Sequence, residues 1–206
     1  MKKNPFIGIA GNIGVGKTTF TSFLAKEFNL KDIYESVSDN PYLSDFYGDM
    51  HRWSFNLQVY FLHHRFASII DIANSHDGFV QDRTIYEDVE IFSKNLHDMG
   101  YLDNRDWKTY SDLFINMTKF LKPPDIIIYL RADLDVLLER INNRNRDYEA
   151  TIDPEYLKRL NVMYDEWIES ISWTKVLTVD TNTFNIFEDK DTLESIFKKI
   201  KEKLKK

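Results

Sequence analysis

The 206-residue sequence contains no cysteine, and it has only seven glycines and five prolines. Without cysteine the chain has no disulfide bonds, no thiolate metal ligands and no cysteine nucleophile. No apolar run approaches the roughly 18 residues of a membrane-spanning helix. The apolar stretch after the N-terminal lysines is interrupted at Asn12, which argues against a signal peptide. These absences favour a cytoplasmic protein with no membrane partner.

An excess of positive charge is also missing. The chain carries 27 Lys and Arg residues against 33 Asp and Glu residues, which gives a formal net charge of −6. Proteins that bind nucleic acid present basic surfaces to its phosphates, so we expect no nucleic-acid polymer among the partners. The length suits one α/β domain with a full core and is short for two. We therefore predict a single domain over residues 1–206.

A phosphate-binding motif lies close to the N-terminus. The apolar run from Phe6 to Ala10 predicts a buried strand, and residues 11–18 fit the pattern G-x-x-x-x-G-K-[ST]. Apolar residues then recur at helical spacing, at Phe20, Phe23, Leu24 and Phe28. A strand, a glycine-rich loop and a helix in this order favour phosphate binding over an ordinary glycine-rich turn before a helix.

The residue types in this loop suit the phosphates of ATP. Glycine allows the backbone to turn with positive φ and to approach a ligand closely. The backbone N–H groups at the start of a helix attract anions. Lys17 can reach the β- and γ-phosphates, and the Thr18 hydroxyl can bind Mg²⁺. The residues predicted to bind ATP here are Gly11, Asn12, Ile13, Gly14, Val15, Gly16, Lys17, Thr18 and Thr19.

Strands alternate with helices along the rest of the chain. Apolar runs predict further strands at residues 32–35, 78–84, 125–130 and 175–179. Helical patterns occupy residues 41–47, 50–74, 85–97, 103–121, 133–143, 154–170 and 193–204. This alternation predicts an α/β fold in which a five-stranded parallel sheet is flanked by helices on both sides. Ligands of such folds bind at the carboxyl ends of the strands.

Charged residues follow two of the predicted strands. Glu35 ends the second strand beside the phosphate loop, where its carboxylate could accept a proton from a hydroxyl group, although a capping or salt-bridged acid fits equally. Asp82 and Arg83 end the third strand. An acid at this place is a candidate ligand of Mg²⁺ together with Thr18, and the arginine could hold the acceptor or the transition state. The alternative for Asp82 and Arg83 is a local ion pair.

Three arginines surround a polar stretch that has few core residues, namely Arg140, Arg144 and Arg146. Arginines in such a stretch suit a lid that closes over nucleotide phosphates. An arginine placed on the transferred phosphoryl group can accelerate transfer by roughly 10³- to 10⁵-fold. We predict a short arginine-rich lid at about residues 143–150 and expect these three arginines to bind ATP. The alternative is a solvated charged loop.

Further motifs accompany these residues in matching order and spacing. They are Tyr34-Glu35-Ser-Val, Arg52-Trp-Ser-Phe-x-x-Gln58 with Arg65 seven residues later, Asp82-Arg83-Thr-x-Tyr-x-Asp88, and Pro154-Glu155-Tyr-Leu. Together with the phosphate loop and the arginine stretch, they resemble the deoxynucleoside kinases over residues 5 to 180. More narrowly, the chain is similar to the branch of deoxyadenosine, deoxyguanosine and deoxycytidine kinases, and most like the bacterial deoxyadenosine kinases.

The resemblance implies a P-loop kinase fold and a homodimer built on helices. It also implies transfer of the γ-phosphate of ATP to the 5′-hydroxyl of a deoxynucleoside, with Mg²⁺ as cofactor, to give the 5′-monophosphate for nucleotide salvage. Glu35 would be the base, and Arg83 and Lys17 would be further catalytic residues. Other side chains would contact the nucleoside: Tyr47 and Glu155 at the 3′-hydroxyl, Gln58, Arg65 and Asp88 at the edges of the base, and Phe92 and Trp53 around its ring.

Base preference is a finer expectation from the same resemblance. The polar pair Arg65 and Asp88 argues against a thymidine-preferring enzyme, and we favour deoxyadenosine, with deoxyguanosine and deoxycytidine as further candidates. The family often has a glutamate where this chain has Asp82. The shorter side chain would alter the distance from the carboxylate to Mg²⁺, and one water molecule could make up the difference.

Two other functions share part of the pattern. A nucleoside monophosphate kinase of the thymidylate kinase type has the loop, the Asp-Arg motif and the lid, but the acid at Glu35 would repel its acceptor phosphate. A non-enzymatic nucleotide-binding switch would use the loop and would need neither a base nor an acceptor pocket.

Overall fold

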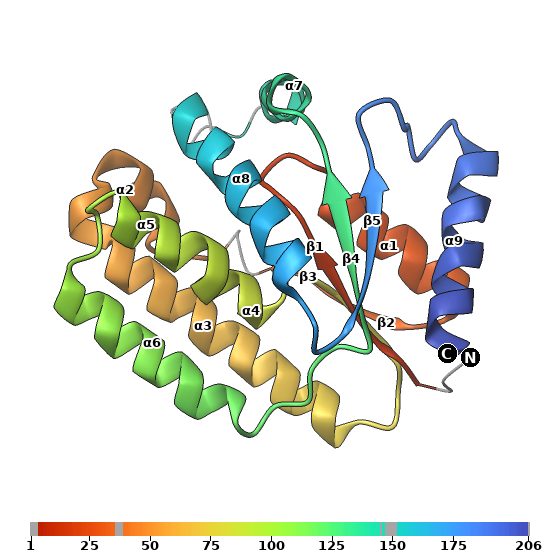
Figure 1. Cartoon of the computed structure of the whole chain (residues 1–206), viewed down its shortest axis with the longest axis horizontal. Coiled ribbons are helices and arrows are strands. Elements are labelled where there is room, and N and C mark those ends of the chain that lie inside the picture. The colour runs from red at the N-terminus through yellow and green to blue at the C-terminus, as the bar shows by residue number, and fades with distance from the viewer. Residues whose placement is uncertain (1–3, 36–38, 145, 147–151, 206) are drawn as a thin grey trace.

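The computed structural model describes residues 4–35, 39–144, 146 and 152–205, and it contains one parallel β-sheet flanked by helices (Figure 1). The five strands lie in the order β2-β3-β1-β4-β5. Their bounds are β1 Phe6–Ala10, β2 Lys31–Ile33, β3 Phe79–Asp82, β4 Ile126–Arg131 and β5 Lys175–Asp180. The α/β prediction with five parallel strands is therefore confirmed.

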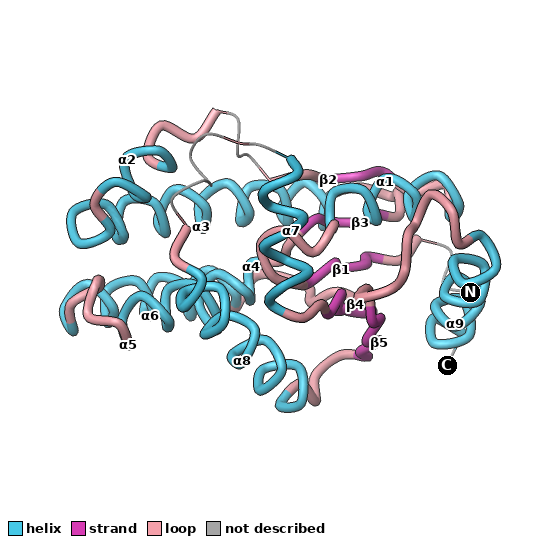
Figure 2. The backbone as a smooth tube through the Cα atoms, turned by 90° about the horizontal axis from the view of Figure 1, so that it is seen from above, coloured by secondary structure: helices cyan, strands magenta, loops and turns pink. Residues whose placement is uncertain are grey.

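The helices connect these strands. Their bounds are α1 Lys17–Phe28, α2 Leu43–Gly48, α3 Met50–Asn74, α4 Ile85–Glu87, η1 Asp88–Ser93, α5 Lys94–Asp98, α6 Asn104–Thr118, α7 Leu134–Arg144, α8 Pro154–Ser170 and α9 Lys190–Lys205. Figure 2 shows α9 on one side of the strands and α3, α6 and α8 on the other, with α7 crossing over the end of the sheet. None of the helices in the described part of the chain is long and apolar enough to cross a membrane.

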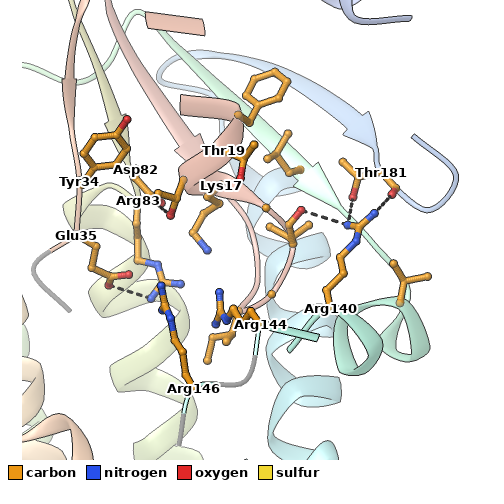
Figure 3. Close-up of a pocket in the computed structure, with 18 of the residues that line it drawn as sticks. Lys17, Thr19, Tyr34, Glu35, Asp82, Arg83, Arg140, Arg144, Arg146 and Thr181 are labelled. Carbon is orange, nitrogen blue, oxygen red and sulfur yellow. Dashed lines mark hydrogen bonds and ion pairs between the residues drawn. The ribbon is translucent and has the colours of Figure 1, made fainter. Parts of the chain in front are cut away.

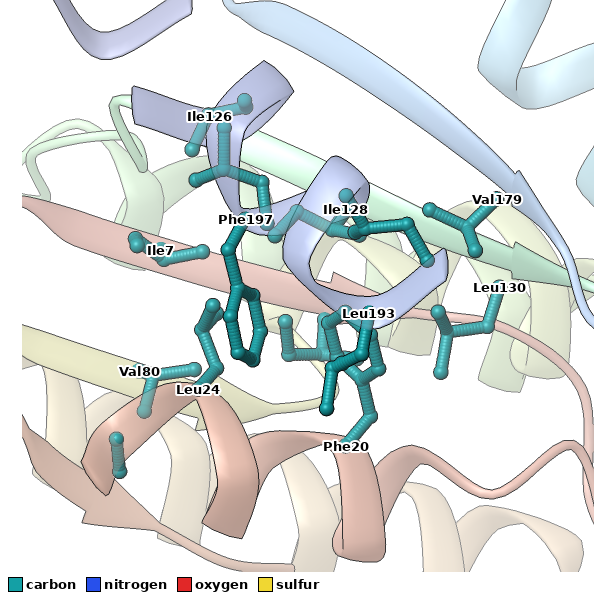
Figure 4. Packing of buried hydrophobic residues seen from close by; sticks show 14 of the residues in the cluster. Ile7, Phe20, Leu24, Val80, Ile126, Ile128, Leu130, Val179, Leu193 and Phe197 are labelled. Atoms are coloured by element: carbon teal, nitrogen blue, oxygen red, sulfur yellow. The ribbon is translucent and has the colours of Figure 1, made fainter. Parts of the chain in front are cut away.

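Both faces of the sheet are buried, which explains why its central strands are apolar at nearly every position. Along β4, Ile126, Ile128 and Leu130 pack in the cluster beneath α1 and α9, which Figure 4 shows from close by. Ile127 and Tyr129, on the alternate positions, pack in a second cluster with α3 and α8. The sheet is therefore held between two helical layers, and its carboxyl edge is the place where side chains can meet a ligand.

Two elements near this edge differ from the predicted ones. Strand β2 ends at Ile33, so Glu35 follows the strand instead of ending it. The helix predicted over residues 85–97 consists of three successive segments, α4, the π-helical segment η1 and α5. A π-helical turn is wider than an α-helical turn and often occurs at functional sites. Here the segment carries Asp88 and Phe92, both of which line the cavity described below.

Candidate active site

A cavity of about 970 Å³ opens at the carboxyl edge of the sheet (Figure 3). Its walls come from the phosphate loop, the segments after β2, β3 and β5, and the helices α2, α3, η1 and α7. The volume lies at the upper end of the range that small-molecule sites occupy. The cavity therefore has room for more than one small ligand, and it lies where an open parallel sheet binds its ligands.

The phosphate loop has the backbone that its glycines were predicted to allow. Gly11, Gly14 and Gly16 have φ values of 148°, 85° and 100°. A β-carbon on Gly11 would lie 2.6 Å from the Leu130 carbonyl oxygen, so no larger residue fits there without a shift of the backbone. The loop leads directly into α1, which begins at Lys17. Its first backbone N–H groups have no partners within the helix and can bind an anion.

Lys17 and Asn12 have different tasks in this loop. The Lys17 ammonium is buried and donates a hydrogen bond to the Asn12 carbonyl oxygen at 3.0 Å. Burial and the nearby Arg83 cation lower the pKa of Lys17 to about 8. The Asn12 side chain donates to the Leu157 carbonyl at 2.9 Å and to Asn161 at 2.7 Å. Asn12, which we predicted to bind phosphate, thus ties the loop to α8 and does not line the cavity.

The two predicted metal ligands meet. The Thr18 hydroxyl donates a hydrogen bond to Asp82 Oδ2 at 2.6 Å. The other carboxylate oxygen, Asp82 Oδ1, is buried and has no hydrogen-bond partner among the described residues. A hydroxyl and an unpaired carboxylate oxygen beside a phosphate loop suit Mg²⁺, which prefers oxygen ligands. No group of three or more metal-binding side chains occurs in the described ranges, so phosphate and water oxygens would have to complete the coordination.

Glu35 lies between two arginines. Its Oε1 atom accepts hydrogen bonds from Arg83 Nη1 at 3.2 Å and from Arg65 Nη2. Burial alone would raise the pKa of this carboxyl, but the cations of Arg83, Arg65 and Lys17 outweigh burial and lower the pKa of Glu35 to about 2. The carboxylate is therefore ionised at neutral pH, as a base must be, and it lines the cavity beside the phosphate loop.

A strained turn places Arg83 opposite the loop. Arg83 has a left-handed φ of 67°, and its backbone N–H donates to the Ile9 carbonyl at 2.9 Å. Left-handed conformations are uncommon for residues other than glycine and often mark functional sites. The Arg83 guanidinium lies 4.1 Å from the centre of the Phe92 ring. The positive charge is thereby held against an aromatic face while one nitrogen pairs with Glu35.

Glu87 is a buried residue at this turn that the sequence analysis did not select. Its carboxylate accepts hydrogen bonds from the Thr84 N–H at 2.7 Å and from the Tyr164 hydroxyl at 2.8 Å. Thr84 and Glu87 form a capping box, so the turn after Arg83 is fixed by the start of α4. The signal for this role was present in the sequence, because Thr-x-x-Glu before an apolar run is the capping-box pattern.

Most of the residues predicted to contact a nucleoside do line the cavity: Tyr47, Gln58, Asp88 and Phe92. The Gln58 side-chain oxygen accepts a hydrogen bond from Ser93 at 3.0 Å, which fixes the amide orientation. Asp88 pairs with Arg65 at 2.7 Å. Burial raises the pKa of Asp88 to about 7, so this carboxyl can change its protonation state near neutral pH. Gln58 and Arg65, seven residues apart on α3, are both buried.

Three of the predicted contact residues do not line this cavity. The Trp53 ring packs 5.8 Å from the ring centre of Tyr42, outside the lining residues. Glu155 is exposed in the first turn of α8, where it pairs with Lys158 at 3.4 Å. Arg65 lies behind the wall, in contact with Glu35 and Asp88. The neighbour of Glu155, the buried Tyr156, lines the cavity instead.

Arginines surround the phosphate end of the cavity. Arg140, Arg144 and Arg146 all line it, and Figure 3 shows Arg144 and Arg146 extending into it. Arg140 Nη1 donates to the Val15 carbonyl at 3.2 Å and to the Thr181 hydroxyl at 3.1 Å, so it braces the loop against β5. Of the predicted lid over residues 143–150, all but residues 143, 144 and 146 lie outside the described residues.

A segment after β5 also lines the cavity, and the sequence analysis missed it. It comprises Thr181, Asn182, Thr183, Phe184, Asn185, Ile186 and Phe187. The segment reaches the cavity beside Arg140 and the phosphate loop, on the side away from Glu35. It matches no motif, and only its place directly after a predicted parallel strand could have indicated that it lies at the ligand-binding edge.

A phosphate loop, a carboxylate that can act as a base and several arginines at one edge of a parallel sheet define a P-loop kinase. The sequence model of the family described as deoxynucleoside kinase matches residues 7–205. The chain belongs to the deoxynucleoside kinase family, as its motifs indicated.

Characterised relatives in this family are similar over nearly the whole chain. The deoxyadenosine/deoxycytidine kinase of Bacillus subtilis (strain 168) is 41% identical over 200 residues, which cover 96% of this chain and 92% of the relative. The deoxyadenosine kinase of Dictyostelium discoideum is 43% identical over 192 residues, which cover 93% and 77%. The structure of deoxyadenosine kinase from M. mycoides with bound dATP superimposes with a TM-score of 0.84 at 30% identity, covering 96% of this chain and 100% of that one.

The lowered pKa of Lys17 predicts a pH dependence of ATP binding. We expect the ammonium to bind phosphate, and the pKa of Lys17 is about 8 instead of 10.5, so the cation is lost as the pH rises through 8. ATP binding should therefore weaken by about tenfold for each pH unit above this pKa. Isothermal titration with ATP between pH 7.5 and 9.5 measures the dependence.

The matched variant is Lys17→Arg, because a guanidinium remains charged over this pH range. Its affinity should be lower at every pH and should show no decrease between pH 7.5 and 9.5. A flat profile in the unmodified protein would show that the Lys17 charge does not limit ATP binding.

Proposed function

We propose that this protein transfers the γ-phosphate of ATP to the 5′-hydroxyl of a deoxynucleoside. The observation that carries the proposal is the position of Glu35, an ionised carboxylate that lines the cavity together with the phosphate loop and the buried polar wall of Gln58 and Asp88. Family membership supports the same reaction, because the characterised relatives are named as kinases of deoxyadenosine, deoxycytidine and deoxyguanosine.

In the proposed reaction, the 5′-hydroxyl oxygen attacks the γ-phosphorus while Glu35 accepts the hydroxyl proton. The bond from the γ-phosphorus to the bridging oxygen breaks, and ADP leaves. A positioned base contributes about 10²- to 10⁴-fold to the rate. Lys17 and Arg83 both line the cavity, where their cations would stabilise the negative charge of the transferred phosphoryl group.

We propose that Thr18 and Asp82 hold Mg²⁺, either directly or through water. The unpartnered Asp82 Oδ1 atom and the Thr18 hydroxyl support this assignment. Mg²⁺ bound between such residues and a nucleotide neutralises charge on the β- and γ-phosphate oxygens. The protein side chains would orient the phosphates and exclude water from the site.

Deoxyadenosine is the acceptor that we favour, with deoxycytidine and deoxyguanosine as further acceptors. Gln58 offers both a donor and an acceptor to a nucleobase, and its oxygen is already oriented by Ser93. A base that leaves Gln58 or Asp88 unpaired would be rejected, because buried polar groups without partners are costly. A nucleoside monophosphate is disfavoured as an acceptor, since its phosphate would approach the Glu35 carboxylate.

The first experiment measures ADP release with ATP and Mg²⁺ across deoxyadenosine, deoxyguanosine, deoxycytidine, thymidine, adenosine and thymidylate. We expect turnover with deoxyadenosine above the other deoxynucleosides and none with thymidylate. Turnover with thymidylate alone would overturn the assignment of Glu35. Tight ATP binding without turnover of any acceptor would favour the nucleotide-binding switch.

Replacing the proposed base tests the mechanism directly. Glu35→Gln keeps the shape of the side chain and removes its charge, so kcat should fall by about 10²- to 10⁴-fold while the variant remains folded. Glu90→Gln is the matched control, because Glu90 is exposed on η1 and lies outside the cavity. Steady-state kinetics with deoxyadenosine compare the two variants, and an active Glu35→Gln enzyme would exclude Glu35 as the base.

We further propose that the protein is a homodimer. The exposed apolar side chains Leu113 and Ile115 on α6, and Phe120 just beyond that helix, support an interface there. Sedimentation velocity should give twice the mass of one chain. The variant Ile115→Glu should shift the protein towards monomer, because a charge buried in an apolar interface opposes association. A monomeric unmodified protein at micromolar concentration would contradict the proposal.

A further inference from the structure

Arg65 joins two carboxylates that face the cavity, but it does not line that cavity itself. Its Nη1 atom lies 2.7 Å from Asp88 Oδ1, and its Nη2 atom donates to Glu35 Oε1. The residue is only 5% exposed. The guanidinium therefore contacts the proposed base and one of the proposed nucleobase contacts at the same time, from the side away from the ligand.

Arg65 belongs to a series of four charged side chains that are linked by ion pairs. Asp88 pairs with Arg65, Arg65 pairs with Glu35, and Glu35 pairs with Arg83. Asp88 lines the part of the cavity formed by η1, whereas Arg83 follows β3 beside the phosphate loop. A buried charge needs partners, so a change at Asp88 alters the pairing at Arg83, at the other end of this series of ion pairs.

We propose that Arg65 is a positioning residue that couples nucleobase recognition to the catalytic base. It holds the Glu35 carboxylate ionised and fixed towards the cavity, and Asp88 holds the opposite side of the guanidinium. A nucleobase that contacts Asp88 is thereby sensed at Glu35 through Arg65. The inference deepens the proposed kinase function and rests on it.

The geometry separates this role from direct contact with the substrate. A planar guanidinium can contact two carboxylates at once. Arg65 donates a hydrogen bond to Glu35 through Nη2 and makes an ion pair with Asp88 through Nη1, whereas a lysine ammonium is a point charge without this planar fork. A cavity of about 20 Å³ lies behind Glu35 and is lined by Tyr34, His64 and Arg65 among others. Its volume suits a water molecule and is far too small for a nucleoside.

The charged groups around Glu35 determine the expected effect. Arg83, Arg65 and Lys17 supply positive charge, and the neighbouring acids Asp82, Glu87 and Asp88 supply negative charge. Removing the Arg65 cation leaves Glu35 buried with fewer cations, so its pKa must rise. Loss of one directly bonded cation shifts a carboxyl pKa by about 1 to 3 units.

The test is the pH profile of kcat/KM for deoxyadenosine, measured in a background in which Asp88 cannot titrate. The parent is Asp88→Asn, and the comparison is Arg65→Met/Asp88→Asn. The double variant also avoids a buried Asp88 carboxylate without its partner, which would threaten folding. We expect the acid limb to move up by about 1 to 3 pH units when Arg65 is replaced, because Glu35 then accepts a proton at higher pH.

Two further variants separate positioning from general damage. Arg65→Lys/Asp88→Asn retains the charge and should recover part of the shift. Arg52→Met/Asp88→Asn changes an exposed arginine on the same helix and should leave the acid limb where the parent has it. An equal shift in the Arg52 variant, or an acid limb that does not move in the Arg65 variant, overturns the proposal.

A second readout does not depend on catalysis. Carbon-13 NMR of labelled glutamate carboxyl groups can follow the Glu35 titration, with the signal assigned by its loss in Glu35→Gln. We expect a low pKa in Asp88→Asn and a pKa higher by about 1 to 3 units in the Arg65 double variant. An unshifted Glu35 titration overturns the coupling even if the protein is a kinase. If no deoxynucleoside is phosphorylated while the titration shifts, the kinase function fails and the Arg65–Glu35 coupling stands.

Discussion

The carboxyl edge of the sheet holds charged side chains away from water, and the need to pair them constrains the structure around them. The buried members are Lys17, Arg65, Arg83, Asp82, Glu87 and Asp88, and Glu35 lies among them. An ion removed from water loses several kcal/mol of solvation unless opposite charges and hydrogen bonds replace it. These side chains come from α1, α3, the end of β3 and the junction of α4 with η1, so the pairing fixes how these elements lie relative to one another.

The backbone around this edge is held in conformations that would be unfavourable alone. Arg83 is left-handed, and the capping box of Thr84 and Glu87 holds the turn that follows. The phosphate loop is held from two sides, by Asn12 bonded to α8 and by Arg140 bonded to Val15. Backbone strain at a functional site persists only where several surrounding contacts hold the strained conformation in place. The capping box and the contacts of Asn12 and Arg140 hold this backbone independently of any ligand.

The sequence was sufficient for the parts of the site that depend on local pattern. The strand, the loop and the helix of residues 6–28 were predicted, and the metal prediction placed Thr18 and Asp82 side by side, where a hydrogen bond joins them. The sequence was insufficient where the rotation of a helix about its axis decides which side chain reaches the cavity. The motif gave Gln58 and Arg65 the same role at the base, but only packing shows that Gln58 reaches the cavity whereas Arg65 lies behind it. On α8, Tyr156 likewise lines the cavity, whereas the neighbouring Glu155 is exposed.

The distribution of charge differs between the two halves of the cavity. One half carries the cations Lys17, Arg140, Arg144 and Arg146 around the loop. The other half contains the carboxylates of Glu35 and Asp88. Arg65, which lies outside the lining, pairs with both carboxylates, and Arg83, which lines the cavity, pairs with Glu35. A triphosphate is therefore attracted to the first half, and a neutral nucleoside can enter the second without repulsion. Charge complementarity of this kind discriminates by excluding the wrong ligand as well as by attracting the right one. On the proposed function, the acids that balance the buried arginines would therefore also exclude a phosphorylated acceptor.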